Sequence, residues 1–220
     1  MKMEILKRSF DSERVRRNYR KVVWFYDFWS WLTESKAAKK IIELAEITDG
    51  ENILEIACGT GVVFEQIAEL NPNGNNTGID LSLDMLEKAK KRLARVNLSN
   101  YELKQGNVLS LEFEDDSFDL VVNNFMVDLM PVESFDMIGR EFFRVTKPGG
   151  RIIISTFSFG QKKINRIWFL VAKILPDLLA GCRPVSFSQY LEAAGFEIEE
   201  KIELSQNTFP SEIIKAMKPV

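Results

Sequence analysis

The chain has 220 residues, 45% of them hydrophobic, which fits one globular domain with a sizeable core. A formal net charge of −3 gives no reason to expect nucleic acid as an electrostatic partner. Histidine is absent, which excludes histidine bases, Ser-His and Cys-His nucleophile pairs and histidine metal ligands. The two cysteines form no Cys-x-x-Cys pair, so we expect no disulfide framework, no metal site and a reducing, cytoplasmic location.

The N-terminal residues 1–48 combine basic side chains with a cluster of aromatic ones. Trp24, Phe28 and Trp31 fall on one face of an expected helix, which either packs into the core or forms a lid over a cofactor and an apolar acceptor. We expect the lid, because all four tryptophans lie in this cluster or at Trp168, in the other apolar stretch outside the expected nucleotide-binding core. Aromatic residues beside a basic segment also suit contact with a membrane surface.

The stretch Ile53–Gly61, ILEIACGTG, predicts a strand, a glycine turn and the start of a helix. Glycine lets the backbone approach a ligand and a helix N-terminus carries partial positive charge, so this arrangement suits a nucleotide. Roughly 20 residues later, Asp80 ends a second apolar run, where an acid suits a pair of ribose hydroxyls. Phe64 stands where a dinucleotide fingerprint needs its third glycine, which disfavours a dehydrogenase. A strand–turn–helix joint without a ligand is the alternative.

Strands and helices alternate along the whole chain, which predicts an α/β fold around a mainly parallel sheet. The expected helices are 36–46, one beginning at Val62, 83–96 after an N-cap at Ser82, 132–145 and 188–194, and the expected strands are 53–56, 77–80, 101–105, 118–123, 151–157, 196–204 and 211–218, with an apolar insertion at 164–180.

Four segments resemble Rossmann-like (class I) S-adenosylmethionine-dependent methyltransferases, and they follow in that family's order over residues 53–157. They are ILEIACGTG, which resembles the first motif (D/E)-x-(G/A)-x-G-x-G, then GIDLSLDMLEKAKKR, QGNVLSLEFEDDSFDLVV and RVTKPGGRIIISTF. The resemblance implies a seven-stranded, mostly parallel sheet with helices on both faces and an antiparallel last strand. It also implies S-adenosyl-L-methionine as the cofactor.

The resemblance implies a role for each motif residue. The first motif's backbone should cup the methionine moiety, with Glu55 helping through water or the amino group. Asp80 should accept from both ribose hydroxyls, and Asn107, where many members have Asp, should accept from the adenine amine. The implied cofactor-binding residues are Glu55, Ala57, Gly59, Thr60, Gly61, Asp80, Leu81, Met85, Asn107, Val108, Asn123 and Asn124.

The acceptor side resembles two groups of enzymes. NYRKVVWFYD is similar to the N-terminal segment of phosphatidylethanolamine methyltransferases, whereas GNV, RVTKPGGR and NTFPSEIIKA are similar to ubiquinone/menaquinone-biosynthesis methyltransferases. The quinone enzymes have an Arg-Asn pair where this chain has Asp128 and Leu129, and their N-terminal MNDLMS is absent. Both groups imply a small, lipophilic acceptor. From the aromatic clustering beside the basic N-terminal segment, we expect segment 24–32 and the insertion 164–180 to close over an apolar acceptor cavity and to make peripheral contact with a membrane. A non-catalytic cofactor-binding scaffold and a methyltransferase for a soluble small molecule are the alternatives.

If the acceptor must lose a proton, the base in a chain without histidine is a carboxylate or a tyrosine. We expect Asp128 first, just past the fourth strand, and then Tyr19 or Tyr26 of the lid. For Asp128, an acid at a helix N-terminus is the alternative. We expect a single domain over 1–220, made of the lid 1–48, the cofactor-binding core 49–160, a helical insertion 161–185 and a C-terminal helix and strands 186–220.

Overall fold

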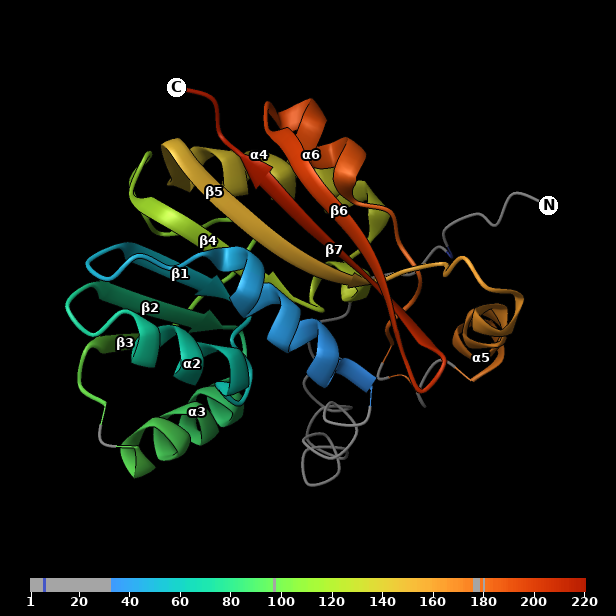
Figure 1. Ribbon diagram of the computed structural model, residues 1–220, viewed down its shortest axis with the longest axis horizontal. Coiled ribbons are helices and arrows are strands. Elements are labelled where there is room, and N and C mark those ends of the chain that lie inside the picture. Colours follow the sequence, from blue (N-terminus) through green and yellow to red (C-terminus); the bar gives the residue numbers. More distant parts are fainter. Residues whose placement is uncertain (1–5, 7–32, 97, 176–178, 180) are drawn as a thin grey trace.

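A sheet with the strand order β3-β2-β1-β4-β5-β7-β6 forms the middle of the molecule (Figure 1). The computed structural model describes residues 6, 33–96, 98–175, 179 and 181–220. The strands are β1 (Asn52–Ile56), β2 (Asn75–Asp80), β3 (Tyr101–Gln105), β4 (Phe118–Asn124), β5 (Thr146–Phe157), β6 (Glu197–Gln206) and β7 (Phe209–Met217). β7 is antiparallel to both of its neighbours and the other pairs are parallel. The expected sheet, with its antiparallel last strand, is therefore confirmed.

Helices cover both faces of this sheet (Figure 1). They are a helix over residues 33–45, α2 (Val62–Leu70), α3 (Leu83–Arg95), α4 (Phe135–Val145), α5 (Arg166–Ile174) and α6 (Ser188–Ala194), with single 3₁₀ turns η1 (Val127–Leu129), η2 (Val132–Ser134) and η3 (Lys163–Asn165). The helix 33–45, α2 and α3 pack on one face, and α4 and α6 pack on the other.

The central strands are apolar on both sides because both of their faces are covered. In β1, Ile53 packs under the helix 33–45 and α2, whereas its neighbour Leu54 packs under α4 and α6. Both side chains are fully buried. This explains why the strand reads as a continuous apolar run interrupted by the single acid Glu55.

The Pro-Gly-Gly run that predicts a turn before the fifth strand lies inside β5, as a bulge. Phe118 of β4 pairs with Thr146, but Leu120 pairs with Arg151, so four residues of β5 are accommodated opposite one of β4. Gly149 has φ 74° and its N–H donates to the Lys218 carbonyl at 2.8 Å. The strand therefore begins five residues before the expected start, because the bulge allows β5 to pair with β4 again at Thr146.

The last two strands extend to a tighter turn than expected. β6 and β7 are joined by the two residues Asn207 and Thr208. Their φ angles are 48° and 69°, and positive φ at both positions is typical of a two-residue hairpin turn. The expected strands 196–204 and 211–218 stop short of this turn. Pro210 obscures it in the sequence, yet Pro210 pairs with Ser205 near the end of the hairpin, where a proline is tolerated.

Some expectations for the N-terminus lie outside the described residues. These are the lid helix around 24–32 and its candidate bases Tyr19 and Tyr26. The domain boundaries stay predictions. Within the described part of the chain, no helix has the length and apolar character needed to span a membrane.

The contact between α4 and α6 generates the first testable prediction. A Cβ added at Gly139 would lie 2.8 Å from the Tyr190 backbone oxygen, a distance that forces the helices apart. We expect Gly139→Ala to lower the free energy of unfolding by about 1–3 kcal/mol, although alanine favours an isolated helix by about 1 kcal/mol. Urea denaturation measures this. Met137→Ala, at an exposed position on α4, is the matched control and should change stability little. A Gly139→Ala variant as stable as the wild type would contradict the close packing.

Candidate functional site

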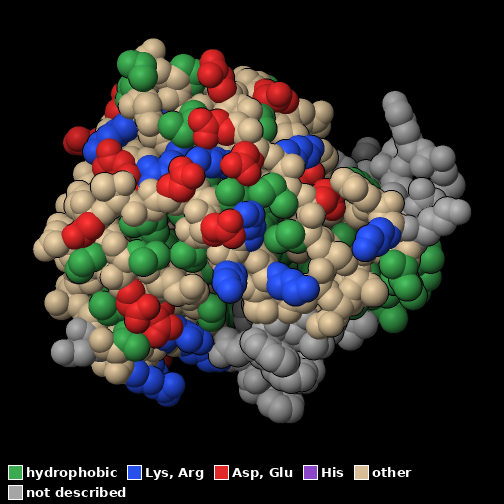
Figure 2. Space-filling model, in the orientation of Figure 1, with side chains coloured by type: hydrophobic (Ala, Val, Ile, Leu, Met, Phe, Trp, Pro, Cys, Tyr) green, Lys and Arg blue, Asp and Glu red, His purple; other side chains and the backbone are tan. Residues whose placement is uncertain are grey.

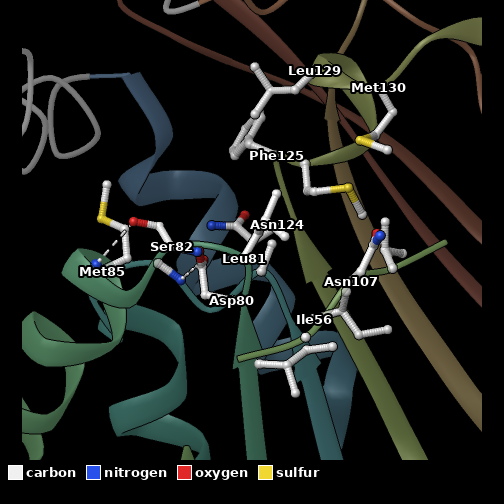
Figure 3. Close-up of a pocket in the computed structure, with 16 residues that line it drawn as sticks. Ile56, Asp80, Leu81, Ser82, Met85, Asn107, Asn124, Phe125, Leu129 and Met130 are labelled. Carbon is white, nitrogen blue, oxygen red and sulfur yellow. Dashed lines mark hydrogen bonds between the residues drawn. The ribbon is translucent and has the colours of Figure 1, made fainter. Parts of the chain in front are cut away.

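A pocket opens at the carboxyl ends of the parallel strands, where β1 lies between β2 and β4 and the connections leave in opposite directions. In open α/β sheets this switch point is the usual ligand site. Asp80 and Ser82 after β2 form a polar side, and Phe125, Leu129 and Met130 after β4 form an apolar side (Figure 3). The pocket therefore offers two chemically different halves.

Most of the residues expected to bind the cofactor meet at this pocket. Those that line it are Ala57, Gly59, Asp80, Leu81, Met85, Asn107, Val108 and Asn124, whereas Glu55, Thr60, Gly61 and Asn123 do not.

The glycine turn after β1 follows a left-handed path that brings backbone to the pocket wall. Ala57, Gly59 and Gly61 have φ 59°, 56° and 80°. A Cβ on Gly59 would meet no atom within 4 Å, so this glycine leaves open space at the pocket. A Cβ on Gly61 would instead lie 3.1 Å from the Ala89 Cβ, so this glycine lets α3 pack closely. The two glycines thus serve different purposes, one at the site and one in packing.

Asp80 is fixed at the tip of β2 by two backbone amides. The N–H of Gly59 donates to Oδ2 at 2.9 Å, and the N–H of Ser82 donates to Oδ1 at 2.8 Å. Burial raises the pKa of Asp80 above its usual value, although these amide bonds oppose the shift. Each carboxylate oxygen retains a further acceptor site, so the group can accept from two neighbouring hydroxyls.

Glu55 is a buried acid beneath the same turn. Its side chain is 2% exposed, and Oε2 has no hydrogen-bond partner among the described residues. Burial, and then the charge of Asp80, raise the pKa of Glu55 well above its usual value. A buried polar atom without a partner is costly. A ligand amine or a water molecule would satisfy it, which fits an amino-acid moiety above the turn.

The three asparagines expected at the site make different contacts. The Asn107 Oδ1 accepts from the Leu109 N–H at 3.0 Å, which fixes its turn and leaves the other lone pair. The Asn123 Nδ2 donates to the Ile56 carbonyl at 2.8 Å, behind the pocket. Asn124 lines the pocket and accepts from the Ser155 hydroxyl. Since adjacent strand residues point to opposite faces, only one of the pair 123–124 reaches the pocket.

The sequence predicted little of the apolar wall, which consists of Phe125, Met126, Leu129 and Met130. Phe125 has φ 49°, rare for a bulky residue, and turns the chain out of β4 over the pocket. Arg183, fully buried, holds this segment from behind: Nη1 donates to the Asp128 carbonyl at 3.1 Å and Nη2 to the Met130 carbonyl. No local sequence pattern predicts these contacts. Ser82 and Gly106 were also missed as pocket residues, although they lie two residues and one residue past expected strand ends.

Asp128 lies behind the apolar wall rather than in the pocket. Its side chain is 1% exposed, and neither carboxylate oxygen meets a donor at ordinary hydrogen-bond geometry among the described residues. Burial raises the pKa of Asp128 to about 7; nearby backbone amides, the Cys182 thiol and the Arg183 charge offset only part of this. The candidate base is therefore a buried acid that does not line the pocket, whereas the next two residues, Leu129 and Met130, do.

The chain is similar to known methyltransferases in sequence and in structure. The family model described as "Methyltransferase domain" matches residues 47–183, more than half of the chain. A demethylmenaquinone methyltransferase of Listeria monocytogenes is 34% identical over 145 residues, which are 64% of this chain and 60% of that protein. One from Bacillus cytotoxicus is 29% identical over 81% of this chain and 77% of that protein. The chain thus spans about 60% of the length of the first of these relatives.

Solved structures share the fold. A SAM-dependent methyltransferase from Aquifex aeolicus superposes with a TM-score of 0.65 and 16% identity, covering 96% of this chain and all of that one. Family and fold together imply S-adenosylmethionine as the cofactor. Asp80, the open space at Gly59 and the unpartnered Glu55 oxygen fit that molecule. The resemblance noted in the sequence is confirmed, and the chain belongs to the methyltransferase domain family, with the class I, Rossmann-like fold.

Proposed function

We propose that the protein is an S-adenosylmethionine-dependent methyltransferase that acts on a small, lipophilic acceptor. The observation that carries this proposal is one pocket with a buried acid, Asp80, on one side and the apolar wall of Phe125, Met126, Leu129 and Met130 on the other. Relatives described as demethylmenaquinone methyltransferases support a lipophilic acceptor.

The polar half would hold the cofactor. Asp80 would accept from the two ribose hydroxyls, and Leu81 and Met85, which line the same side, would pack on the adenine. Asn107 and Val108 follow β3 and would contact the far edge of the base. The glycine turn would leave room for the methionine moiety, with the Glu55 oxygen beneath it.

Bound S-adenosylmethionine supplies a methyl group already activated on a sulfonium. The main task of the chain is then to align an acceptor and to exclude water. Good alignment is worth roughly 7–11 kcal/mol of the barrier. Phe125, Leu129 and Met130 give the acceptor side an apolar surface, and the flexible methionine side chain adapts to irregular ligands. This half suits an apolar ring or chain better than a soluble amine.

The base, if the acceptor needs one, stays a prediction. Asp128 would have to turn from behind the wall to reach the pocket. A role as the acid in the first turn of η1 would explain its position without catalysis. Tyr19 and Tyr26 lie outside the described residues. The Asp128 experiment below separates a base from a buried acid.

Methyl transfer itself is the direct test. We expect the purified protein to transfer a labelled methyl group from S-adenosylmethionine to components of a lipid or quinol extract, but not to a panel of soluble amines. Partition of the label into the organic phase measures this. Label found only in the aqueous phase would contradict a lipophilic acceptor while keeping the methyltransferase. No transfer to any extract, with cofactor binding intact, would favour a non-catalytic scaffold.

Asp80→Asn should weaken binding of S-adenosylhomocysteine by about 1.5–3 kcal/mol, or about 10–150-fold, because a charged acceptor for two hydroxyls is lost. Isothermal calorimetry measures this. Asp84→Asn, an exposed acid in the first turn of α3, is the control and should bind like the wild type. Thermal melting without ligand checks that the turn still folds. Equal affinity in the two variants would remove Asp80 from the site.

Asp128→Asn tests the buried acid through pH. Since the folded pKa of about 7 lies above the unfolded value of about 3.9, the stability that Asp128 contributes is full below pH ~4 and is lost as pH rises to ~7. Asparagine has no such loss, so we expect the variant to be more stable at pH 8, by about 4 kcal/mol at most, with a flatter profile. Urea denaturation across this range measures both.

Asp136→Asn, an exposed acid in the first turn of α4, is the matched control and should leave the profile unchanged. A wild-type profile that is flat between pH 4 and 7 would contradict the raised pKa. In the same variant, a kcat loss of about 10²–10⁴-fold with unchanged cofactor affinity would assign the base to Asp128. A kcat within about threefold of the wild type would remove that role.

A further inference from the structure

We propose that the outer face of α5 docks on an anionic lipid surface. The proposal rests on the proposed function, since a lipophilic acceptor would reach the pocket from such a surface. The partner is a membrane interface bearing negatively charged headgroups, and the contact is peripheral.

The outer face of α5 and its flanks is a row of exposed apolar side chains. Ile164, Ile167, Leu170, Ile174 and Leu175 are each 52–69% exposed. Their spacing of three or four residues up to Ile174 places them along one side of a helix. Other large exposed apolar residues, such as Leu70 and Met137, lie on separate helices. In Figure 2 hydrophobic side chains gather at the edge of the molecule where Figure 1 shows α5.

The same segment is positively charged in an acidic chain. Residues 158–176 contain Lys162, Lys163, Arg166 and Lys173 and no Asp or Glu, although the whole chain has a net charge of −3. Lys162 and Lys173 are exposed. An apolar face flanked by cations is typical of a helix that lies in the headgroup region of an anionic membrane.

The inner side of the segment fixes it to the sheet, so the outer row is not needed to anchor the helix. The Trp168 Nε1 donates to the Thr208 Oγ1 at 3.0 Å, and the indole packs edge-on against Phe209 at 5.3 Å. The Asn165 Nδ2 donates to the Thr208 carbonyl at 2.6 Å, and Ala172 is fully buried. These contacts hold α5 and its flanks, the platform, against the β6–β7 turn.

The platform lies at the edge of the sheet that carries the pocket. β5 ends at Phe157 at the carboxyl edge, and α5 follows. After α5 the chain returns to Arg183, whose guanidinium holds the Asp128 and Met130 carbonyls of the apolar wall. A surface contacted by α5 would therefore lie near the acceptor half of the pocket.

A second copy of the chain fits this face less well. A symmetric dimer would set identical faces against each other and bring Lys162 and Lys173 of both copies together. Like charges in such a contact are unfavourable. An anionic surface removes this repulsion, so the positive charge of the segment favours a membrane over a second copy of the chain.

Vesicle co-sedimentation tests the proposal. The full-length protein should bind vesicles of equal parts phosphatidylcholine and phosphatidylglycerol at low salt, and bind phosphatidylcholine vesicles at least about tenfold more weakly. Ile167→Ser/Ile174→Ser should lower the affinity for the mixed vesicles at least about tenfold, since two apolar side chains no longer enter the interface. Lys162→Glu/Lys173→Glu should lower it similarly and reduce its dependence on salt.

Leu70→Ser/Met137→Ser removes two apolar side chains of similar exposure from α2 and α4 and should bind vesicles like the wild type. Absence of wild-type binding to the mixed vesicles, or equal loss in the two serine pairs, would overturn the proposal. A dimer in light scattering that Ile167→Ser/Ile174→Ser dissociates, without vesicle binding, would assign the face to a second copy. Calorimetry with S-adenosylhomocysteine in the absence of lipid distinguishes the two proposals. A protein that binds vesicles but not S-adenosylhomocysteine would contradict the proposed function and leave the membrane contact standing.

Discussion

The contact between the Gly59 amide and the Asp80 carboxylate, 2.9 Å long, joins the ends of two neighbouring strands at the point where the site opens. The amide comes from a β1 turn that follows a left-handed path through Ala57, Gly59 and Gly61. α3 packs closely against the same turn, where Gly61 leaves space. An acid held in this way is already oriented before a ligand arrives, so binding need not order it.

The pocket is two-sided because of the topology. The segments after β1 and β2 enter helices almost at once, so their wall consists of short turns and a helix start, and it carries the polar groups of Asp80 and Ser82. The segment after β4 instead crosses the pocket as the 3₁₀ turn η1 before α4 begins, and it presents Phe125, Leu129 and Met130. The two different sides of the pocket thus arise from two ways in which the chain leaves one sheet.

The sequence predicted most of the residues on the Asp80 side of the pocket but few of those in the apolar wall, for a physical reason. The glycine turn, Asp80 and Asn107 belong to local strand–turn patterns, which short-range sequence carries. The apolar wall depends on Arg183, which is 53 positions from the Met130 carbonyl it holds and is buried without any amphipathic pattern. Likewise the Pro-Gly-Gly run indicated a turn, but pairing with Lys218 near the C-terminus made it a bulge. Contacts between distant parts of the chain decided both cases.

Two buried acids, Glu55 and Asp128, have raised pKa values, which lower the stability of the fold as the pH rises. Their positions suggest a different role for each. Glu55 lies beneath the glycine turn with an oxygen that a ligand group or water could satisfy, so its cost is recoverable on binding. Asp128 lies behind the wall beside Arg183, where its charge partly balances a buried guanidinium that holds the wall through backbone carbonyls. Removing the arginine would leave those carbonyls and the acid uncompensated, whereas removing the acid leaves a cation that still has two acceptors. The wall therefore depends on Arg183 more than on Asp128, which favours a positional over a chemical role for that acid.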